Sequence, residues 1–491
     1  MLLQELLQDI ECKEIIGSRN KDIQRLSQDS RDETFKDGLY FAVTGTQVDG
    51  HDFIPDVISK EAIAIVCEQL PPVLHDDVTY MIVENSRKAV GEIASAFYGH
   101  PSRELDVIAV TGTNGKTSVA TYASQALGRL GETTLLLSTA GDYFKDELIT
   151  LERKAPSSLE VIEFHKILRK YRDQGAGYVC LEATSQALDQ DRLAGIDIDI
   201  AIFTNLDQDH LDYHKTIEHY AASKKKLFDN LKPSAIAISN YDDTSGMMMV
   251  KDTQAQKISY GKDPSYDYHF SINSTKLGSV TVTINGQALT LPVIGEFNIY
   301  NLISVYAILI QRGFNVHKVV EVLEQVDGVP GRMEQVQNDR GVLALVDYAH
   351  SPGALESVLT TLQKLPHNKI TTIIGCGGDR DRAKRPLMAE VTQKLSDTVF
   401  YTSDNPRTEK LEQIFADMKE GVDTNKNNFT FIENREAAIQ QAVNQAGEDD
   451  IILVAGKGHE DYQIIGTIKH HFDDKKVIEA CFAKINKKSS H

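Results

Sequence analysis

Residues 107–118 read Val-Ile-Ala-Val-Thr-Gly-Thr-Asn-Gly-Lys-Thr-Ser, and this stretch decides the fold. Its apolar start predicts a buried strand, its small residues predict a turn, and a helix is expected to open at Lys116. In such a turn backbone N–H groups face a phosphate, the lysine adds charge near the β- and γ-phosphates, and Thr117 can bind Mg²⁺. Val110 stands where the full G-x-x-x-x-G-K-[ST] pattern has its first glycine, so this is a shortened form. The stretch therefore predicts a nucleotide-binding α/β unit.

Further strand candidates on the C-terminal side extend this unit. They are residues 177–182, 198–206 and 235–239, separated by polar or helical sequence, as parallel sheets require. Between about Lys257 and Val293, alternating apolar and polar residues predict a small antiparallel sheet with a hairpin turn. A second α/β series begins after Gly331, with strand candidates at 342–347, 369–374, 398–402, 428–432 and 451–455.

The length of 491 residues exceeds what one hydrophobic core usually organises. The pattern changes near residue 100, and the Gly-Val-Pro-Gly stretch at 328–331 interrupts regular structure. We therefore expect three α/β domains, at residues 1–100, 101–330 and 331–491.

Composition excludes several functional classes. A net charge of −19 disfavours nonspecific binding of nucleic acid, which depends on many basic groups. No apolar stretch is long enough to cross a bilayer, and the first residues lack the basic and apolar regions of a secretory signal. The five cysteines are scattered and include no C-x-x-C pair, which disfavours disulfides and structural zinc. We expect a cytoplasmic protein without a membrane span.

The shortened loop is the form found in Mur ligases and in their folylpolyglutamate synthase relatives. Motifs further along the chain resemble Mur ligase motifs in the same order: Leu181–Leu188, Phe203–His214, Gly295–Asn301, Gly331-Arg332, Val346–Pro352, Gly375–Pro386, Asp404–Arg407 and Gly456–Gln463. This resemblance covers nearly the whole chain. It implies an N-terminal uridine-nucleotide-binding α/β domain, a central P-loop ATPase-like parallel sheet with a small antiparallel sheet, and a C-terminal Rossmann-like α/β domain.

The resemblance implies ATP as a substrate and Mg²⁺ as a cofactor. The residues that it implies for ATP are Gly112, Thr113, Asn114, Gly115, Lys116, Thr117, Asn298, Asn301, Arg332 (on phosphate) and Asp347 (near the ribose). The metal ligands that it implies are Thr117, Glu182 and His210, and the catalytic set that it implies is Lys116, Glu182, His210 and Lys224. Oxygen and nitrogen ligands beside a phosphate loop suit a divalent metal that bridges ATP and a second substrate.

Mur ligases also carry a carbamylated lysine that shapes the metal site, and Lys224 aligns with it. Carbamylation (N6-carboxylysine) turns a cation into an anion, which can then support a metal. The neighbouring Lys225 is the alternative, because three lysines stand in a row here and can also form a solvated helix face.

The tetrad Asp-Asn-Pro-Arg at 404–407 resembles that of the diaminopimelate-adding members. A second amino-acid head group has a carboxylate, which Arg407 and Arg385 can pair with, and an ammonium, which Glu460 and the Gly456 carbonyl can accept. The amino-acid-binding residues implied are Arg385, Asp404, Asn405, Arg407, Gly456 and Glu460. Lysine lacks the second carboxylate, so the arrangement favours diaminopimelate.

The N-terminal stretches 28–31 and 45–53 resemble the uridine-nucleotide-binding domain of these ligases. Residues implied for the UDP-linked substrate are Ser30, Lys154, Ser157, Ser158, Thr184 and Arg192. Residues 153–160 depart from the usual Asn-Thr-Thr-Pro-Glu-Ser, with Lys154 and Ala155 replacing the two threonines. Lys154 can compensate by pairing with an acidic dipeptide, and a divergent acceptor is the alternative.

Together with these features, the resemblance implies a monomeric, ATP-dependent ligase of peptidoglycan precursor synthesis. The expected reaction joins meso-diaminopimelate to the D-Glu γ-carboxyl group of UDP-N-acetylmuramoyl-L-Ala-D-Glu through an acyl phosphate. One alternative is a lysine-adding or folylpolyglutamate ligase, although Arg407 opposes the first and the N-terminal domain the second. Another is a non-catalytic paralogue that binds the muramoyl nucleotide, which the complete set of catalytic residues opposes.

Overall fold

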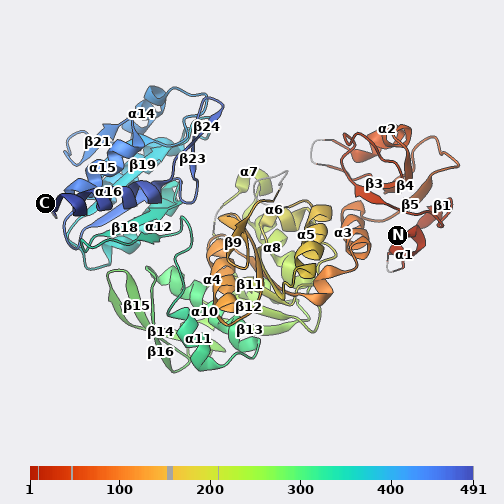
Figure 1. Ribbon diagram of the computed structural model, residues 1–491, viewed down its shortest axis with the longest axis horizontal. Helices are drawn as coiled ribbons and strands as arrows, with labels where there is room; N and C mark the ends of the chain where they lie inside the picture. Colours follow the sequence, from red (N-terminus) through yellow and green to blue (C-terminus); the bar gives the residue numbers. More distant parts are fainter. Residues whose placement is uncertain (9, 46–47, 152–158, 208, 490–491) are drawn as a thin grey trace. The chain divides into compact units, whose positions relative to one another are not determined.

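The computed structural model describes all residues except 9, 46–47, 152–158, 208 and 490–491 (Figure 1). The chain forms two compact units, which we describe separately. The first contains Met1–Gly261, Ser265–Asp267 and Ala307–Arg312. The second contains Lys262–Pro264, Tyr268–Tyr306 and Gly313–His491.

The N-terminal part of the first unit is a five-stranded sheet. Its order is β1 (Glu14–Ile16), β5 (Thr79–Ile82), β4 (Ala62–Cys67), β3 (Gly38–Phe41) and β2 (Arg25–Ser27). Only β1 runs antiparallel to its neighbour. Separate apolar clusters collect around Leu39 and Phe41 and around Tyr40 and Ile65, because neighbouring strand residues point to opposite faces. Helices α1 (Leu3–Leu6), α2 (Ile54–Ser59) and α3 (Ser86–Phe97) complete this part.

The rest of the first unit is built on a mainly parallel sheet. Its order is β13 (Gln256–Gly261), β12 (Ile236–Asn240), β11 (Ile200–Phe203), β6 (Asp106–Thr111), β10 (Tyr178–Glu182), β7 (Thr134–Ser138), β8 (Gly141–Phe144) and β9 (Glu147–Ile149). The strands from β13 to β7 are parallel. Helices α4 (Lys116–Arg129), α5 (Val161–Asp173), α6 (Ser185–Asp189), α7 (Leu211–His214), α8 (Ile217–Asp229) and α9 (Gly246–Met249) accompany it.

The position of β6 in this sheet predicts where a ligand would bind. The chain leaves β6 toward β7 on one side, and β11 lies on the other side. Ligands of open parallel sheets bind at such a switch point, beyond the carboxyl ends of the strands. Glu182 is the last residue of β10 at this edge, and the loop at 112–115 and Asn205 follow the ends of β6 and β11.

The second unit contains an antiparallel sheet and a mainly parallel one. Strands β14 (Tyr268–Lys276), β15 (Ser279–Ile284) and β16 (Gln287–Leu291) form the predicted antiparallel sheet. The prediction extended that sheet back to Lys257, but β13 at this position pairs parallel with β12. Helices α10 (Glu296–Gln311) and α11 (Val316–Leu323) follow.

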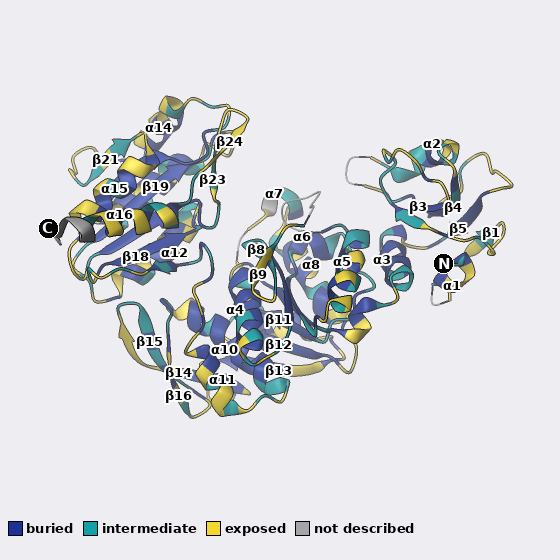
Figure 2. Ribbon diagram, viewed as in Figure 1, coloured by how far each residue is buried: buried dark blue, intermediate teal, exposed yellow. Residues whose placement is uncertain are grey.

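The C-terminal sheet has the order β17 (Glu334–Val336), β18 (Leu343–Asp347), β22 (Ile451–Ala455), β19 (Ile370–Cys376), β20 (Thr398–Ser403) and β21 (Phe429–Ile432). All but β17 are parallel, and they coincide with the five predicted strands. Helices α12 (Pro352–Gln363), α13 (Lys384–Leu395), α14 (Leu411–Lys419), α15 (Arg435–Gln445) and α16 (Asp474–Ser489) cover both faces, and β23 (Tyr462–Ile465) pairs with β24 (Ile468–His471). In Figure 2 the central strands β18 and β19 are buried, whereas α15 and α16 expose one side.

Within the described part of the chain, every helix falls short of the length and apolarity that a membrane crossing needs.

Candidate functional site

The loop between β6 and α4 has the shape of a phosphate cradle. Gly115 adopts φ +88° as the residue before α4, and Gly112 adopts φ +151°. A Cβ atom at Gly112 would lie 1.9 Å from Thr204 Oγ1, so only glycine fits there. Lys116 Nζ donates to the carbonyl oxygens of Gly112 (3.0 Å) and Thr113 (2.8 Å). The loop thus lies at the start of a 14-residue helix, where the helix dipole favours an anion.

The end of β11 holds this loop in place. Thr204 Oγ1 donates to the Asn114 carbonyl at 2.6 Å, and Asn205 Oδ1 accepts the Asn114 backbone N–H at 2.9 Å. The Asp207 backbone N–H donates to Thr113 Oγ1 at 2.8 Å. These bonds fix the loop before any ligand binds.

Glu182, at the end of β10, belongs to a cluster of oxygen atoms beside the loop. Its Oε1 accepts the backbone N–H of Thr139 (2.7 Å) and the Thr139 hydroxyl (3.1 Å). Thr139 Oγ1 lies 3.2 Å from Thr117 Oγ1. Two hydroxyls and a carboxylate are the oxygen ligands that Mg²⁺ prefers, so this set fits the implied metal.

Lys224 points from α8 at the same loop. Its side chain is 1% exposed, its Nζ donates to the Gly112 carbonyl at 2.7 Å, and the ammonium lies 4.2 Å from the centre of the Tyr220 ring. Burial lowers the pKa of Lys224 well below its usual range, and Lys116 acts in the same direction. Lys225 forms ion pairs with Asp229 and Asp252 instead. Of these two lysines, only Lys224 contacts the phosphate loop.

His210 lies near this group but is less enclosed. It adopts φ +52°, its side chain is 49% exposed, and its ring centre lies 6.3 Å from that of Tyr220. The Tyr220 hydroxyl donates to Thr113 Oγ1 at 3.2 Å, which ties the tyrosine to the loop. The structure therefore brings Thr117 and Glu182 together through Thr139, and leaves His210 at the rim.

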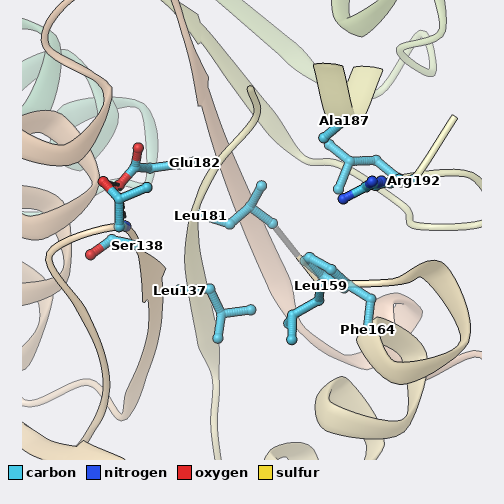
Figure 3. Close-up of a pocket in the computed structure, with 10 residues that line it drawn as sticks. Leu137, Ser138, Leu159, Phe164, Leu181, Glu182, Ala187 and Arg192 are labelled. Carbon is cyan, nitrogen blue, oxygen red and sulfur yellow. Dashed lines mark hydrogen bonds between the residues drawn. The ribbon is translucent and has the colours of Figure 1, made fainter. Parts of the chain in front are cut away.

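A pocket begins at Glu182 and reaches Arg192. Figure 3 shows these two side chains on opposite sides of Leu181. The lining residues are Leu137, Ser138, Thr139, Leu159, Phe164, Leu181, Glu182, Ala187, Arg192 and Leu193. Arg192 donates to Gln190 Oε1 at 2.8 Å, and its Nη2 lies 3.6 Å from Glu160 Oε1.

The other residues implied for the UDP-linked substrate are more scattered. Thr184 caps α6 by accepting the Ala187 N–H at 3.2 Å. Ser30 is partly buried, and its carbonyl accepts from Lys60 Nζ at 2.8 Å. Lys154, Ser157 and Ser158 lie outside the described residues.

In the second unit, the carboxyl ends of β20 and β22 bring together Asp404, Asn405, Gly456 and Glu460. Asn405 Nδ2 donates to Glu460 Oε2 at 2.8 Å. Gly456 adopts φ +107°, and a Cβ atom there would lie 2.9 Å from Asp404 Oδ2. Arg407 adopts φ +52° and donates to the Gly378 carbonyl at 2.8 Å.

Arg385 was expected to pair with a substrate carboxylate, but its guanidinium already has partners. It is 0% exposed and donates to Glu409 (2.8 and 3.0 Å) and to Asp417 (2.8 Å). It also donates to the Gly377 carbonyl at 3.1 Å. A buried guanidinium paired in this way supports the loop beneath the site. Its direct contact with a substrate stays a prediction, and the function proposed below relies on Arg407.

The four remaining residues implied for ATP also belong to the second unit. The Arg332 guanidinium lies 4.8 Å from the centre of the Tyr348 ring. The Asp347 carboxylate accepts the backbone N–H groups of Met333 and Ala349, both at 2.7 Å, and burial raises its pKa although Arg332 opposes this. Asn298 and Asn301 are buried near the start of α10, and Asn301 Nδ2 donates to Asn298 Oδ1 at 3.1 Å.

Comparisons with known proteins agree on one family. Three family models match: "Mur ligase family, catalytic domain" at residues 23–98, "Mur ligase middle domain" at 110–309 and "Mur ligase, glutamate ligase domain" at 331–458. A relative from Parabacteroides distasonis is 40% identical over 486 residues, covering 98% of this chain and 99% of its own length. This chain belongs to the Mur ligase family.

Named relatives of this Mur ligase share one designation. The Parabacteroides distasonis protein and a Clostridioides difficile protein, 38% identical over 494 residues, are both named UDP-N-acetylmuramoyl-L-alanyl-D-glutamate–2,6-diaminopimelate ligase. The latter alignment covers 99% of this chain and 100% of the relative. A solved structure of a protein with the same name matches with a TM-score of 0.73 and 32% identity, covering 99% of both chains. MurF from Acinetobacter baumannii, 17% identical with a TM-score of 0.59 and 98% coverage of both chains, shares the fold.

Sequence reasoning assigned no role to several residues that contact the implied site residues of this Mur ligase, among them Thr139, Tyr220 and Lys457. Thr139 follows β7, whose leucine-rich sequence is not distinctive for a strand. Tyr220 precedes Lys224 by four residues, which places both on one face of α8, and that spacing could have revealed it.

Proposed function

We propose that this Mur ligase joins meso-diaminopimelate to the γ-carboxyl group of D-Glu in UDP-N-acetylmuramoyl-L-Ala-D-Glu, converting ATP to ADP and phosphate. The observation that carries the proposal is the placement of Asn405, Arg407 and Glu460 at one edge of the C-terminal sheet. A guanidinium and a carboxylate together suit an amino-acid head group, which carries both charges. The names of the full-length relatives support the same reaction.

The first step transfers the γ-phosphoryl group of ATP to the D-Glu carboxylate, giving an acyl phosphate and ADP. Residues 112–117 cradle the phosphates, and Lys116 exchanges its bonds to loop carbonyls for bonds to phosphate oxygens. Thr117, Glu182 and His210 would hold Mg²⁺, which neutralises charge on the phosphates. We assign Asn298, Asn301, Arg332 and Asp347 to ATP as well.

Lys224 is proposed to carry a carbamate. Carbamylation joins the free amine to CO₂ and releases a proton, so it requires a deprotonated lysine. The burial of Lys224 and the nearby charge of Lys116 favour that deprotonated form. The resulting anion would replace a second cation beside the phosphate loop with a group that can support the metal.

In the second step the amine of the incoming amino acid attacks the acyl phosphate carbonyl. The new C–N bond displaces phosphate, and the amine loses its proton. Glu460 and the Gly456 carbonyl accept the ammonium at the distal head group, while Arg407 pairs with its carboxylate. Asp404 and Asn405 position these groups, since the Asn405 backbone N–H donates to Asp404 Oδ1 at 2.6 Å.

The acidic end of the muramoyl dipeptide is proposed to contact the surface between Glu182 and Arg192, with the uridine end toward Ser30. Arg192 offers a guanidinium to the acidic dipeptide, and Thr184, Lys154, Ser157 and Ser158 complete the proposed contacts. Water exclusion matters here, because water hydrolyses an acyl phosphate. We further propose domain boundaries near residues 100 and 330, a monomer and a cytoplasmic location.

The deciding experiment measures ADP release with ATP, Mg²⁺ and UDP-N-acetylmuramoyl-L-Ala-D-Glu, comparing meso-diaminopimelate with L-lysine. A preference for diaminopimelate that shrinks at least tenfold in Arg407→Asn supports the proposal. A preference for lysine overturns the assignment of the acceptor. Release that no acceptor stimulates overturns the ligase function itself, and favours a paralogue that binds without turnover.

A further inference from the structure

Lys457 is a fully buried cation inside the proposed amino-acid site. It stands between Gly456 and Glu460, and its side chain is 0% exposed. A buried ammonium is stable only when it is paired and hydrogen-bonded. Its Nζ lies 3.2 Å from Glu460 Oε2 and 3.5 Å from Asn405 Oδ1, and also donates to the Tyr462 carbonyl oxygen.

These three contacts use the full donor capacity of the ammonium. A lysine side chain has three N–H donors and no acceptor, and here each donor has one acceptor of the chain itself. Lys457 therefore has no donor left for a substrate. Any effect on substrate binding must pass through the side chains that it contacts.

Glu460 receives both of its side-chain contacts on the same oxygen atom. Asn405 Nδ2 (2.8 Å) and Lys457 Nζ (3.2 Å) both approach Oε2. Among the described residues, no side chain or backbone group donates a hydrogen bond to Oε1, although the Glu460 side chain is only 18% exposed. The carboxylate is thus held by one oxygen and presents the other.

Asn405 is oriented by the same group. Its Oδ1 accepts the Ile464 backbone N–H at 2.8 Å and faces Lys457, which leaves Nδ2 to donate to Glu460. The donors at Oδ1 therefore define which way the amide is turned. A cation, an amide and a carboxylate consequently determine one another's orientation.

We infer that Lys457 is a positioning residue for the incoming amino acid: it holds Glu460 and Asn405 so that Glu460 Oε1 receives the substrate's ammonium group. The inference rests on the proposed function, because it assumes that the edge of β20 and β22 binds the amino acid. Lys457 is not one of the amino-acid-binding residues that the family resemblance implies. Its expected effect is confined to one of the three substrates, the amino acid.

The test compares Lys457→Met with wild type in steady-state ligation. Methionine keeps the aliphatic volume and removes the charge. We expect the KM for meso-diaminopimelate to rise at least tenfold, while the KM values for ATP and the muramoyl dipeptide stay within twofold. The matched control is Lys469→Met. Lys469 is exposed and also contacts Tyr462, with its Nζ 4.2 Å from the centre of the ring. The control should leave all three KM values unchanged.

A double-mutant cycle separates positioning from a general structural role. If Lys457 acts through Glu460, then Lys457→Met should add less than threefold to the KM of Glu460→Gln. Additive effects, parallel changes in all three KM values, or an unchanged KM for the amino acid would each overturn the inference. Should Lys457→Met not fold, Lys457→Arg decides by the same three KM values, since it keeps the charge but cannot match three divergent acceptors. A wild-type chain that uses neither diaminopimelate nor lysine would overturn the proposed function, and this inference with it.

Discussion

Lys224 and Lys116 share one acceptor, the carbonyl oxygen of Gly112, at 2.7 and 3.0 Å from their Nζ atoms. Two ammonium groups at one oxygen repel each other, and the buried one, Lys224, has its pKa lowered by burial first and by Lys116 second. A phosphate would attract Lys116 away from the carbonyl. Carbamylation of Lys224 would remove the repulsion altogether.

Lys224→Arg is therefore expected to abolish most ligase activity. Arginine keeps a positive charge and cannot form the carbamate, so kcat should fall at least a hundredfold. Steady-state ADP release measures the loss of kcat. Intact-protein mass spectrometry in the presence of bicarbonate measures the loss of the carbamate. The matched control is Lys225→Arg, because Lys225 pairs with Asp229 and Asp252 instead of with the Gly112 carbonyl. Activity of Lys224→Arg within threefold of wild type would contradict the carbamate.

Gly112→Ala should impair ATP binding. Its Cβ atom would lie 1.9 Å from Thr204 Oγ1, and φ +151° is strained for any other residue. Because Thr204 also holds Asn114, the loop must deform, and we expect the KM for ATP to rise at least tenfold. Gly131→Ala is the control: its φ is +95°, but its Cβ would meet nothing within 4 Å. An equal loss in both variants would mean that backbone strain alone matters.

The sequence predicted most of the fold because parallel strands are continuous apolar runs. Residues 451–455 and 369–374 correspond to β22 and β19 almost to the residue. It missed β7, since Leu135–Leu137 fits a helix as well as a strand. With β7 the prediction also lost Thr139, which links Glu182 to Thr117.

Single residues of the site were harder to predict than the elements that carry them. The sequence alone could not show that Glu409 and Asp417 both pair with Arg385. The loop after β20, which carries Glu409, and helix α14, which carries Asp417, meet α13 only in the folded chain. The choice between the adjacent lysines, in contrast, could have been made from the sequence. Tyr220 and Lys224 are one helical turn apart on the buried face of α8, so periodicity could have excluded Lys225.

Arg435 and Asp474 form a fully buried ion pair that should matter for stability. Both side chains are 0% exposed; the guanidinium donates to both carboxylate oxygens at 2.8 and 2.7 Å, and to the Ala455 carbonyl at 2.9 Å. Removing one partner leaves a buried charge, so Arg435→Met should lower the free energy of unfolding by about 3–5 kcal/mol.

Urea unfolding followed by circular dichroism measures this effect. The double variant Arg435→Met/Asp474→Leu should regain part of the loss, because no unpaired charge remains. The exposed pair of Lys13 with Glu84 is the control, and Lys13→Met should change the free energy of unfolding by less than about 1 kcal/mol. A double variant less stable than either single variant would refute the explanation.

His165 should make the protein sensitive to acid. It is 0% exposed on α5, its Nε2 lies 3.0 Å from the Ala194 carbonyl, and burial lowers its pKa to about 4. The unfolded chain has an ordinary histidine, so between pH 6.5 and 4 it binds more protons than the folded chain. The stability that neutral His165 provides is therefore complete above pH 6.5 and is lost as the pH falls toward 4, by about 3 kcal/mol for this shift.

His165→Gln, which keeps a donor for the Ala194 carbonyl but does not titrate, isolates this contribution. The free energy of unfolding of wild type minus that of the variant should decrease steadily from pH 7 through pH 5.5 to pH 4.5. If the difference for His165→Gln does not change with pH, the histidine is protonated in the folded protein, which would require a counter-charge at the buried α5 site.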